Sequence, residues 1–263
     1  MSKANKKLVL VKLGGSVITD KSKPYTARVD VIRRLGKELK KVEKDYQIII
    51  SHGSGSFGHT SAKKYGGSKG YKSKLGISKV SFDVQQINLI VTKALIEEGL
   101  PAISLRPMSM ILTEEGEIKK NIFEIIEEML RQDLIPVVYG DVIWDKKWKS
   151  VIYSGEKFLN RIASHLLKKG FKIDKIIQVG QTDGVYEKNK KTIPVITKKN
   201  WPKAKKHLYE TSSDDVTGGM SHKIEDALLM ADQGIKTLLI NGNTPNELVN
   251  AFCNKKTKGT LIS

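Results

Sequence analysis

The stretch that decides the fold is Leu8-Val9-Leu10-Val11-Lys12-Leu13-Gly14-Gly15-Ser16. Its first six residues are apolar and partly β-branched except for one lysine, which predicts a short buried strand. The two glycines that follow allow a tight turn and leave backbone N–H groups free to face an anion. Because Lys12 lies near the end of a buried strand, it either extends to water or needs an anionic partner in the protein or in a ligand.

Outward from this stretch, strand and helix patterns alternate along the whole chain. Apolar runs predict strands at Leu8–Leu13, Tyr46–Ser51, Pro101–Leu105, Ile135–Tyr139, Lys175–Val179 and Lys236–Ile240, and an edge strand at Thr260–Ile262. Helical spacing of apolar residues predicts helices at Arg28–Lys44, Ser78–Glu98, Ile122–Arg131, Glu156–Lys169, Met220–Gln233 and Asn246–Ala251. Hairpins are expected within Met110–Lys120 and Asp141–Tyr153. This alternation predicts an α/β fold in which helices cover both faces of a mainly parallel sheet.

Composition and charge narrow the class of protein. The 263 residues include 46 Lys+Arg against 28 Asp+Glu, a net charge of +18, and 39% are apolar, as in a folded globular chain. A large positive charge is typical of proteins that bind nucleic acids, so nucleic-acid binding is one interpretation. A lysine-rich surface that attracts small anionic substrates is favoured, because arginines are few and no basic helix carries interleaved aromatic residues. Within the chain, the lysine-rich stretch Lys188–Lys206 is expected to be a surface excursion.

Other classes are excluded by features that the sequence lacks. No apolar run approaches the roughly 18 residues of a membrane helix, and Lys12 interrupts the apolar stretch that a secretory leader would need. Cys253 is the single cysteine, which excludes an internal disulfide and a multi-cysteine metal site. We therefore expect a cytoplasmic protein with no membrane partner. The absence of a Walker A motif excludes P-loop kinases, and the motif set of protein kinases is absent too. The absence of G-x-S-x-G and H-E-x-x-H argues against α/β-hydrolases and zincins.

A second glycine-rich turn follows the second predicted strand: His52-Gly53-Ser54-Gly55-Ser56-Phe57-Gly58-His59. It matches G-x-G-x-x-G, but no strand ending in an acidic residue follows at the spacing of a dinucleotide site, so NAD binding is disfavoured. A phosphate cradle is favoured instead. Beside such a cradle, His59 is a candidate hydrogen-bond donor to a phosphoryl oxygen, whereas His52 at the strand end fits a buried structural role equally well.

Three further turns follow predicted strands or begin predicted helices. They are Ser154-Gly155-Glu156, Thr182-Asp183-Gly184-Val185-Tyr186 and Asp214-Asp215-Val216-Thr217-Gly218-Gly219-Met220, the last with Lys223 one turn into the helix. Paired glycines at a helix start with a lysine on the first turns are typical of phosphate binding.

Taken in order, the Lys12–Ser16, Thr182–Tyr186 and Asp215–Met220 motifs, with Lys223, resemble those of the amino acid kinase superfamily. The block ending Ser56-Phe57-Gly58-His59, with Thr19-Asp20-Lys21 and Pro136-Val137-Val138-Tyr139-Gly140-Asp141, resembles the isopentenyl phosphate kinases within it. The match runs from Leu8 to Gly259-Thr260. It implies an open αβα sandwich and Mg²⁺-dependent transfer of a phosphoryl group from ATP to isopentenyl phosphate, giving isopentenyl diphosphate for isoprenoid biosynthesis. It also implies a homodimer, and one domain over 1–263 with an acceptor-binding lobe (about 1–170) and a nucleotide-binding lobe (about 171–263).

The resemblance also implies roles for individual residues. The expected catalytic residues are Lys12, Lys21, His59 and Lys223, and no metal-ligating residue is assigned. The expected contacts with ATP come from Lys12, Gly14, Gly15, Ser16, Ser54, Asp183, Gly184, Tyr186, Asp214, Gly219 and Lys223. The expected contacts with the acceptor phosphate come from Gly53, Gly58, His59 and Gly155. The isopentenyl tail also needs an apolar pocket. The helical pattern makes Val80, Phe82, Val84, Ile87 and Val91 candidates for it, although core packing is the favoured role for most of them.

The chain departs from the family pattern at two positions. Ser54 stands where the family usually has glycine, and Glu156 stands where related kinases carry an aspartate that organises two lysines. Three other functions stay open: a fosfomycin kinase, an acetylglutamate or uridylate kinase, which should lack His59, and a non-catalytic relative that binds anions or nucleic acid.

Overall fold

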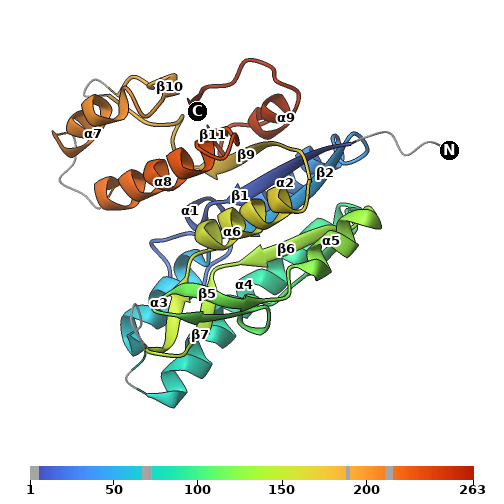
Figure 1. Cartoon of the computed structure of the whole chain (residues 1–263), viewed down its shortest axis with the longest axis vertical. Coiled ribbons are helices and arrows are strands. Elements are labelled where there is room, and N and C mark those ends of the chain that lie inside the picture. Colours follow the sequence, from blue (N-terminus) through green and yellow to red (C-terminus); the bar gives the residue numbers. More distant parts are fainter. Residues whose placement is uncertain (1–5, 67–70, 72, 188–189, 211–215) are drawn as a thin grey trace.

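The computed structural model describes residues 6–66, 71, 73–187, 190–210 and 216–263. Its main sheet contains β1 (Lys7–Leu13), β2 (Tyr46–His52), β3 (Ala102–Ser104), β6 (Ile135–Tyr139), β9 (Ile173–Gly180), β10 (Val195–Ile196), β11 (Thr237–Asn241) and β12 (Gly259–Ile262). The strand order is β10-β12-β11-β9-β1-β2-β6-β3, and every neighbouring pair is parallel except β11 and β12. Figure 1 shows β1 and β2 between β9 and β6. The predicted mainly parallel sheet is confirmed.

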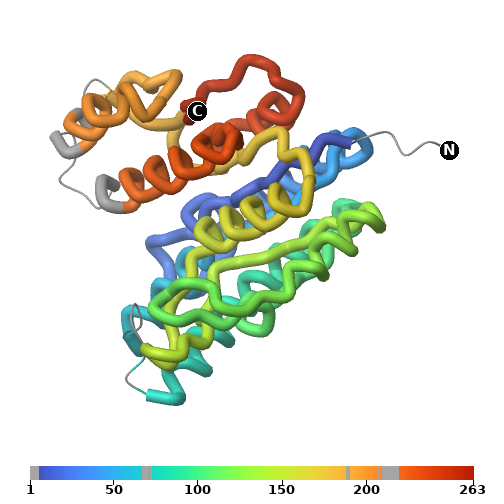
Figure 2. The backbone as a smooth tube through the Cα atoms, in the orientation of Figure 1, coloured from blue at the N-terminus to red at the C-terminus, as the bar shows by residue number. Residues whose placement is uncertain are grey.

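The first strand of the chain lies in the middle of the sheet. In Figure 2 the blue N-terminal strands run between the orange and red C-terminal part and the green middle part. A second sheet combines the two predicted hairpins, in the order β5-β4-β7-β8. Its strands are β4 (Ile111–Glu114), β5 (Glu117–Asn121), β7 (Asp141–Asp145) and β8 (Lys149–Tyr153).

Helices cover both faces of the main sheet, as predicted. They are α1 (Gly15–Ile18), α2 (Val29–Lys40), α3 (Gly55–Tyr65), α4 (Lys74–Glu97), α5 (Glu124–Arg131), α6 (Gly155–Lys168), α7 (Trp201–Glu210), α8 (Val216–Ala231) and α9 (Glu247–Phe252), with a 3₁₀ turn η1 (Pro107–Ser109). Within the described residues, no helix is long and apolar enough to cross a bilayer.

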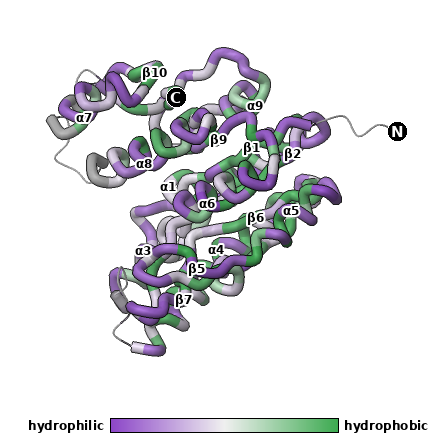
Figure 3. Tube along the Cα trace, in the orientation of Figure 1, coloured by the Kyte–Doolittle hydropathy of each residue, from purple (hydrophilic) through white to green (hydrophobic). Residues whose placement is uncertain are grey.

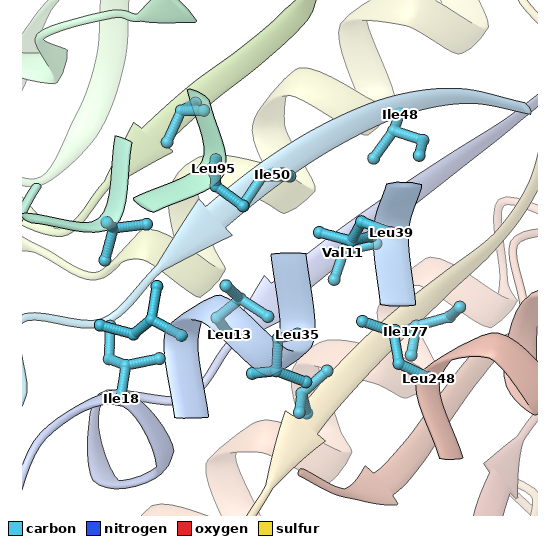
Figure 4. Packing of buried hydrophobic residues seen from close by; sticks show 14 of the residues in the cluster. Val11, Leu13, Ile18, Leu35, Leu39, Ile48, Ile50, Leu95, Ile177 and Leu248 are labelled. Carbon is cyan, nitrogen blue, oxygen red and sulfur yellow. The ribbon is translucent and has the colours of Figure 1, made fainter. Parts of the chain in front are cut away.

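Alternation along β1 assigns its side chains to two cores. Val9, Val11 and Leu13 pack with α2, α4 and α9 on one face, as Figure 4 shows for part of this cluster. Leu8 and Leu10 pack with α5 and α6 on the other face. Figure 3 shows hydrophobic residues along the central strands and the helices beside them. Because Lys12 alternates with Leu10, it lies on the α6 face.

Four expectations about elements were wrong. Part of the glycine-rich turn after β2 is helix α3, which starts at Gly55. The lysine-rich stretch includes β10 and the start of α7, and Trp201, Ala204 and Leu208 bury an apolar face at helical spacing. β12 is not an edge strand, because it pairs with both β10 and β11. Finally, α4 begins at Lys74, where the Ser73 side chain accepts a hydrogen bond from the Gly76 N–H.

The turns at the carboxyl edge of the sheet pack backbone to backbone. A Cβ on Gly15 would lie 2.5 Å from the Gly55 nitrogen, and a Cβ on Gly53 would lie 2.8 Å from the Gly15 nitrogen. A Cβ on Gly155 would lie 2.5 Å from the His52 oxygen. Glycine is therefore needed here for close approach of three chain segments, and this packing brings the starts of α1, α3 and α6 together.

We expect Gly155→Ala to destabilise the fold by about 1–3 kcal/mol, because the methyl group would press on rigid backbone. The matched control is Gly180→Ala, since the nearest atom to a Cβ at Gly180 is 3.9 Å away. Urea unfolding of the two variants measures the difference. Equal stability of the two variants would contradict this packing.

Candidate active site

Three neighbouring strands carry polar side chains in one row near their carboxyl ends. Lys12 on β1 pairs in register with Ser51 on β2 and with Gln178 on β9. All three contact the first turn of α6. Ser51 Oγ donates to the Gly155 oxygen at 2.7 Å, Gln178 Nε2 donates to Glu156 Oε1 at 3.0 Å, and Lys12 Nζ lies 3.9 Å from Glu156 Oε2. Register thus brings a lysine and a carboxylate together beside the glycine turns.

The Lys12 ammonium is the main electrostatic feature of this row. Its residue is 8% exposed, and burial lowers the pKa of Lys12 below its usual 10.5. The Glu156 carboxylate opposes that shift, while the positive charge of Lys223 on α8 adds to it. Lys12, Lys223 and Glu156 together carry a net positive charge, which favours binding of an anion beside them. We call these three side chains, with the glycine turns next to them, the cradle. Glu156, at the position where the sequence departs from the family, makes the ion pair with Lys12.

Thr19 joins the two phosphate-type turns that the sequence predicts. Its Oγ1 donates to the Gly15 oxygen at 2.7 Å and accepts from the Ser56 N–H at 2.9 Å. Lys21 follows two residues later and is exposed to solvent. The N–H groups of Gly14 and Gly53 donate to Val179 and Leu13 oxygens, so these two amides are used within the fold.

Ser54 adopts a backbone conformation open to serine, with φ −80° and ψ −15°. Its side chain lies over Gly58, where a Cβ would be 2.2 Å from Ser54 Oγ. Glycine at position 58 therefore makes room for the serine. His59, the next residue of α3, is exposed.

His52 is buried behind the second turn. Its ring stacks on Tyr139 of the neighbouring strand at 5.5 Å between centroids, and its Nε2 is 3.2 Å from Asn88 Oδ1 on α4. Burial lowers the pKa of His52 to about 4, so the ring is neutral at pH 7. Of the two roles that the sequence left open for His52, the buried one is confirmed.

The turn predicted beside the nucleotide follows β9. The Asp183 N–H donates to the Tyr186 hydroxyl at 3.1 Å, and Asn241 Nδ2 donates to Asp183 Oδ1 at 2.8 Å. Gly184 has φ +98°, a conformation that favours glycine. Gly219 and Lys223 lie on α8, and Asp214 lies outside the described residues.

A small apolar cluster lies beside the second turn. It consists of Val80, Val84, Tyr139 and Val142, with Tyr65, Tyr71, Ile77 and Met108 packed against it. A Cβ on Gly58 would lie 3.1 Å from Val84 Cγ1, so the cluster adjoins α3. Of the other tail-pocket candidates, Ile87 and Val91 belong to the main core, and Phe82 is 55% exposed.

Sequence reasoning missed Ser51 and Gln178 as partners of the cradle. A signal for Gln178 was present, because it interrupts an apolar run two residues before Gly180, as Lys12 does two residues before Gly14. Within the described residues, no three acidic, histidine or cysteine side chains gather into a metal site.

Comparison with known proteins identifies the family. The chain matches the model of the amino acid kinase family over residues 7–241. It is 31% identical to the isopentenyl phosphate kinase of Methanothermobacter thermautotrophicus, covering 97% of this chain and 99% of the relative. It is 33% identical to that of Methanocaldococcus jannaschii, covering 97% and 98%. A solved isopentenyl phosphate kinase structure aligns with a TM-score of 0.80 at 28% identity, over 97% of this chain and 100% of the other. The chain therefore belongs to the amino acid kinase family and, within it, to the isopentenyl phosphate kinases.

Proposed function

We propose that this protein transfers a phosphoryl group from ATP to isopentenyl phosphate, giving isopentenyl diphosphate. The observation that carries the proposal is the buried Lys12–Glu156 pair, with the Lys223 charge nearby, beside the glycine turns at the carboxyl edge of the sheet. Ligands of open α/β sheets bind at this edge. The relatives named isopentenyl phosphate kinase support the choice of acceptor.

We assign the two substrates to the two lobes predicted from the sequence. In this assignment residues of about 171–263 hold the nucleotide, through Asp183, Gly184, Tyr186, Asp214 and Gly219. Residues of about 1–170 hold the acceptor phosphate, through Gly53, Gly58, His59 and Gly155, and the turn Gly14–Ser16 and Ser54 lie between the two. The exposed position of His59 on α3, beside the apolar cluster, fits this assignment.

The chemistry that the chain's residues perform is alignment and charge neutralisation. Two phosphate groups repel each other at reacting distance, and Lys12, Lys21 and Lys223 offset that repulsion. The acceptor is a phosphate monoester with a second pKa of about 6, so at pH 7 it is already largely dianionic and needs no catalytic base. His59 therefore acts as a donor that orients the acceptor phosphate. Glu156 holds Lys12 in place, since its other oxygen is fixed by Gln178.

Mg²⁺ fits this site as a companion of the nucleotide. Glu156, the buried carboxylate of the cradle, is already engaged by Lys12 and Gln178, and Mg²⁺ is commonly held by substrate phosphates and water with few protein ligands. When bound, the ion neutralises charge on the phosphates. We also propose that the protein is a homodimer and that it is cytoplasmic. Its single cysteine, Cys253, is exposed and forms no internal disulfide, as is usual for proteins of the reducing cytoplasm.

The direct test is ADP release from Mg-ATP with isopentenyl phosphate, with fosfomycin, and without an acceptor. We expect turnover with isopentenyl phosphate, because the apolar cluster beside the cradle suits its tail. Turnover with fosfomycin alone would make the chain a fosfomycin kinase. Nucleotide binding with no turnover on either acceptor would favour a non-catalytic anion-binding relative.

Glu156→Gln should lower kcat by about 10- to 100-fold, the scale of one lost charge-assisted contact in a buried site. The amide keeps the shape and the contact with Gln178 but leaves Lys12 without its carboxylate. Steady-state kinetics measure the effect. The matched control is Glu127→Gln, which removes a buried carboxylate on α5, away from the cradle. An unchanged kcat in Glu156→Gln would remove Glu156 from the proposed mechanism.

The outer face of α4 supports the proposed dimer. Leu75, Phe82, Leu89 and Ile96 repeat every seven residues and are 62%, 55%, 60% and 55% exposed. This spacing places them along one side of the helix. We propose that two copies of this stripe pack together across a two-fold axis.

The double variant Phe82→Lys and Leu89→Lys should therefore be a monomer, because two lysines would place like charges across the interface. Light scattering after size exclusion measures the mass. Leu229→Lys is the control, since Leu229 is equally exposed, at 57%, but lies on α8. A monomeric unchanged protein, or a double variant that stays dimeric, would contradict this interface.

A further inference from the structure

The inner face of α4 carries two buried polar side chains among apolar ones. Ser81 and Asn88 are 3% and 4% exposed and are seven residues apart, so they lie on the same side of the helix two turns from each other. Val84 lies between them on that side and contacts the Gly58 position of α3. Burying a polar side chain costs free energy unless the side chain is hydrogen-bonded. The hydrogen-bond partners of Ser81 and Asn88 therefore indicate which segments of the chain these residues join to α4.

Asn88 connects α4 to the ends of two strands. Its Nδ2 donates to Ser104 Oγ at the end of β3, at 2.6 Å. Its Oδ1 lies 3.2 Å from His52 Nε2 at the end of β2. Because His52 immediately precedes Gly53, this contact fixes the start of the predicted phosphate turn relative to the helix.

Ser81 connects α4 to the start of the second sheet. Its Oγ donates to Asp141 Oδ1 at 3.3 Å and accepts from Arg106 Nη2 at 2.8 Å. Asp141 is the first residue of β7, and its side chain is 0% exposed. Arg106 Nε lies 3.9 Å from Asp141 Oδ2, the second carboxylate oxygen. Three separate segments therefore meet at one buried carboxylate.

The Asp141 carboxylate depends on these few contacts. Burial raises the pKa of Asp141 to about 6, against the opposing effects of the Val142 and Met108 N–H groups, Arg106 and Ser81. Among the described residues, Oδ2 has no hydrogen bond of normal geometry. Burial, with the nearby Asp141 carboxylate as the second cause, raises the pKa values of Tyr71 and Tyr139, which belong to the apolar cluster. The carboxylate thus lies beside the cluster proposed to face the acceptor.

We propose that Ser81 and Asn88, through Asp141, Arg106 and His52, are positioning residues that fix α4 relative to the phosphate turn. Val80, next to Ser81, and Val84, between Ser81 and Asn88, carry the apolar side chains proposed to receive the acceptor's tail. The two polar contacts therefore set the distance between these side chains and the phosphate turn. The inference rests on the proposed function, because it assigns these contacts to the acceptor and not to the nucleotide.

The test compares Asp141→Asn and Asn88→Leu with the unchanged protein. Both changes nearly keep side-chain volume; the first removes the charge that Arg106 faces, and the second removes both amide hydrogen bonds. We expect the KM for isopentenyl phosphate to rise about tenfold in each variant, with kcat and the KM for ATP within about twofold. Steady-state kinetics with each substrate varied in turn separate the three quantities.

The control for lost stability is Glu38→Gln. Glu38 is also a buried carboxylate paired with an arginine, Arg34, but it joins α2 to the start of α9. Its variant should lose stability in urea without a change in the acceptor KM. Two results would overturn the inference and give Ser81 and Asn88 a purely structural role. The first is a similar rise in the KM for isopentenyl phosphate in Glu38→Gln. The second is an equal rise of the KM for isopentenyl phosphate and the KM for ATP in the two test variants.

Different results would contradict the proposed function and the positioning role of Ser81 and Asn88. If the unchanged protein turns over isopentenyl phosphate and both variants keep its acceptor KM, the positioning inference is wrong and the proposed function stands. If the unchanged protein does not turn over isopentenyl phosphate, the proposed function fails, and the inference fails with it.

Discussion

The burial of the Lys12 ammonium is the constraint on which the rest of the site depends. A cation near the end of a central strand is tolerated because Glu156 lies 3.9 Å away and Gln178 fixes that carboxylate from the next strand. One carboxylate balances one lysine, and Lys223 adds a second positive charge. This net positive charge favours an anionic ligand beside Lys12.

The carboxyl ends of the central strands place functional side chains on both faces of the sheet. On the α6 face, the row Ser51–Lys12–Gln178 holds the charged part of the site. On the opposite face, the neighbouring residue His52 stacks on Tyr139 and contacts α4. Alternation along β2 thus directs Ser51 to the α6 face and the next residue, His52, to the α4 face.

The sequence predicted what depends on local chemistry. The strand around Lys12, its glycine turn and the family followed from adjacent residues, and so did both hairpins. Helix α3 was missed because its first residues, Gly55 and Ser56, are poor helix formers. Helix α7 was missed because lysines obscure the spacing of Trp201, Ala204 and Leu208. The contacts of Gln178, Asn88 and Asp141 depend on strand register and on helix placement, which separate segments of sequence do not encode.

We propose that Lys12 is a buried cation that pairs with the phosphates of the bound nucleotide. The most direct measurement is an NMR titration of the Lys12 side chain, assigned with a Lys12→Arg variant, with and without Mg²⁺ and a non-hydrolysable ATP analogue. We predict a pKa below the usual 10.5 in the free protein and a clear rise when the nucleotide binds, because phosphate stabilises the ammonium. A Lys12 pKa at its usual value that does not change when the nucleotide binds would contradict this role of Lys12.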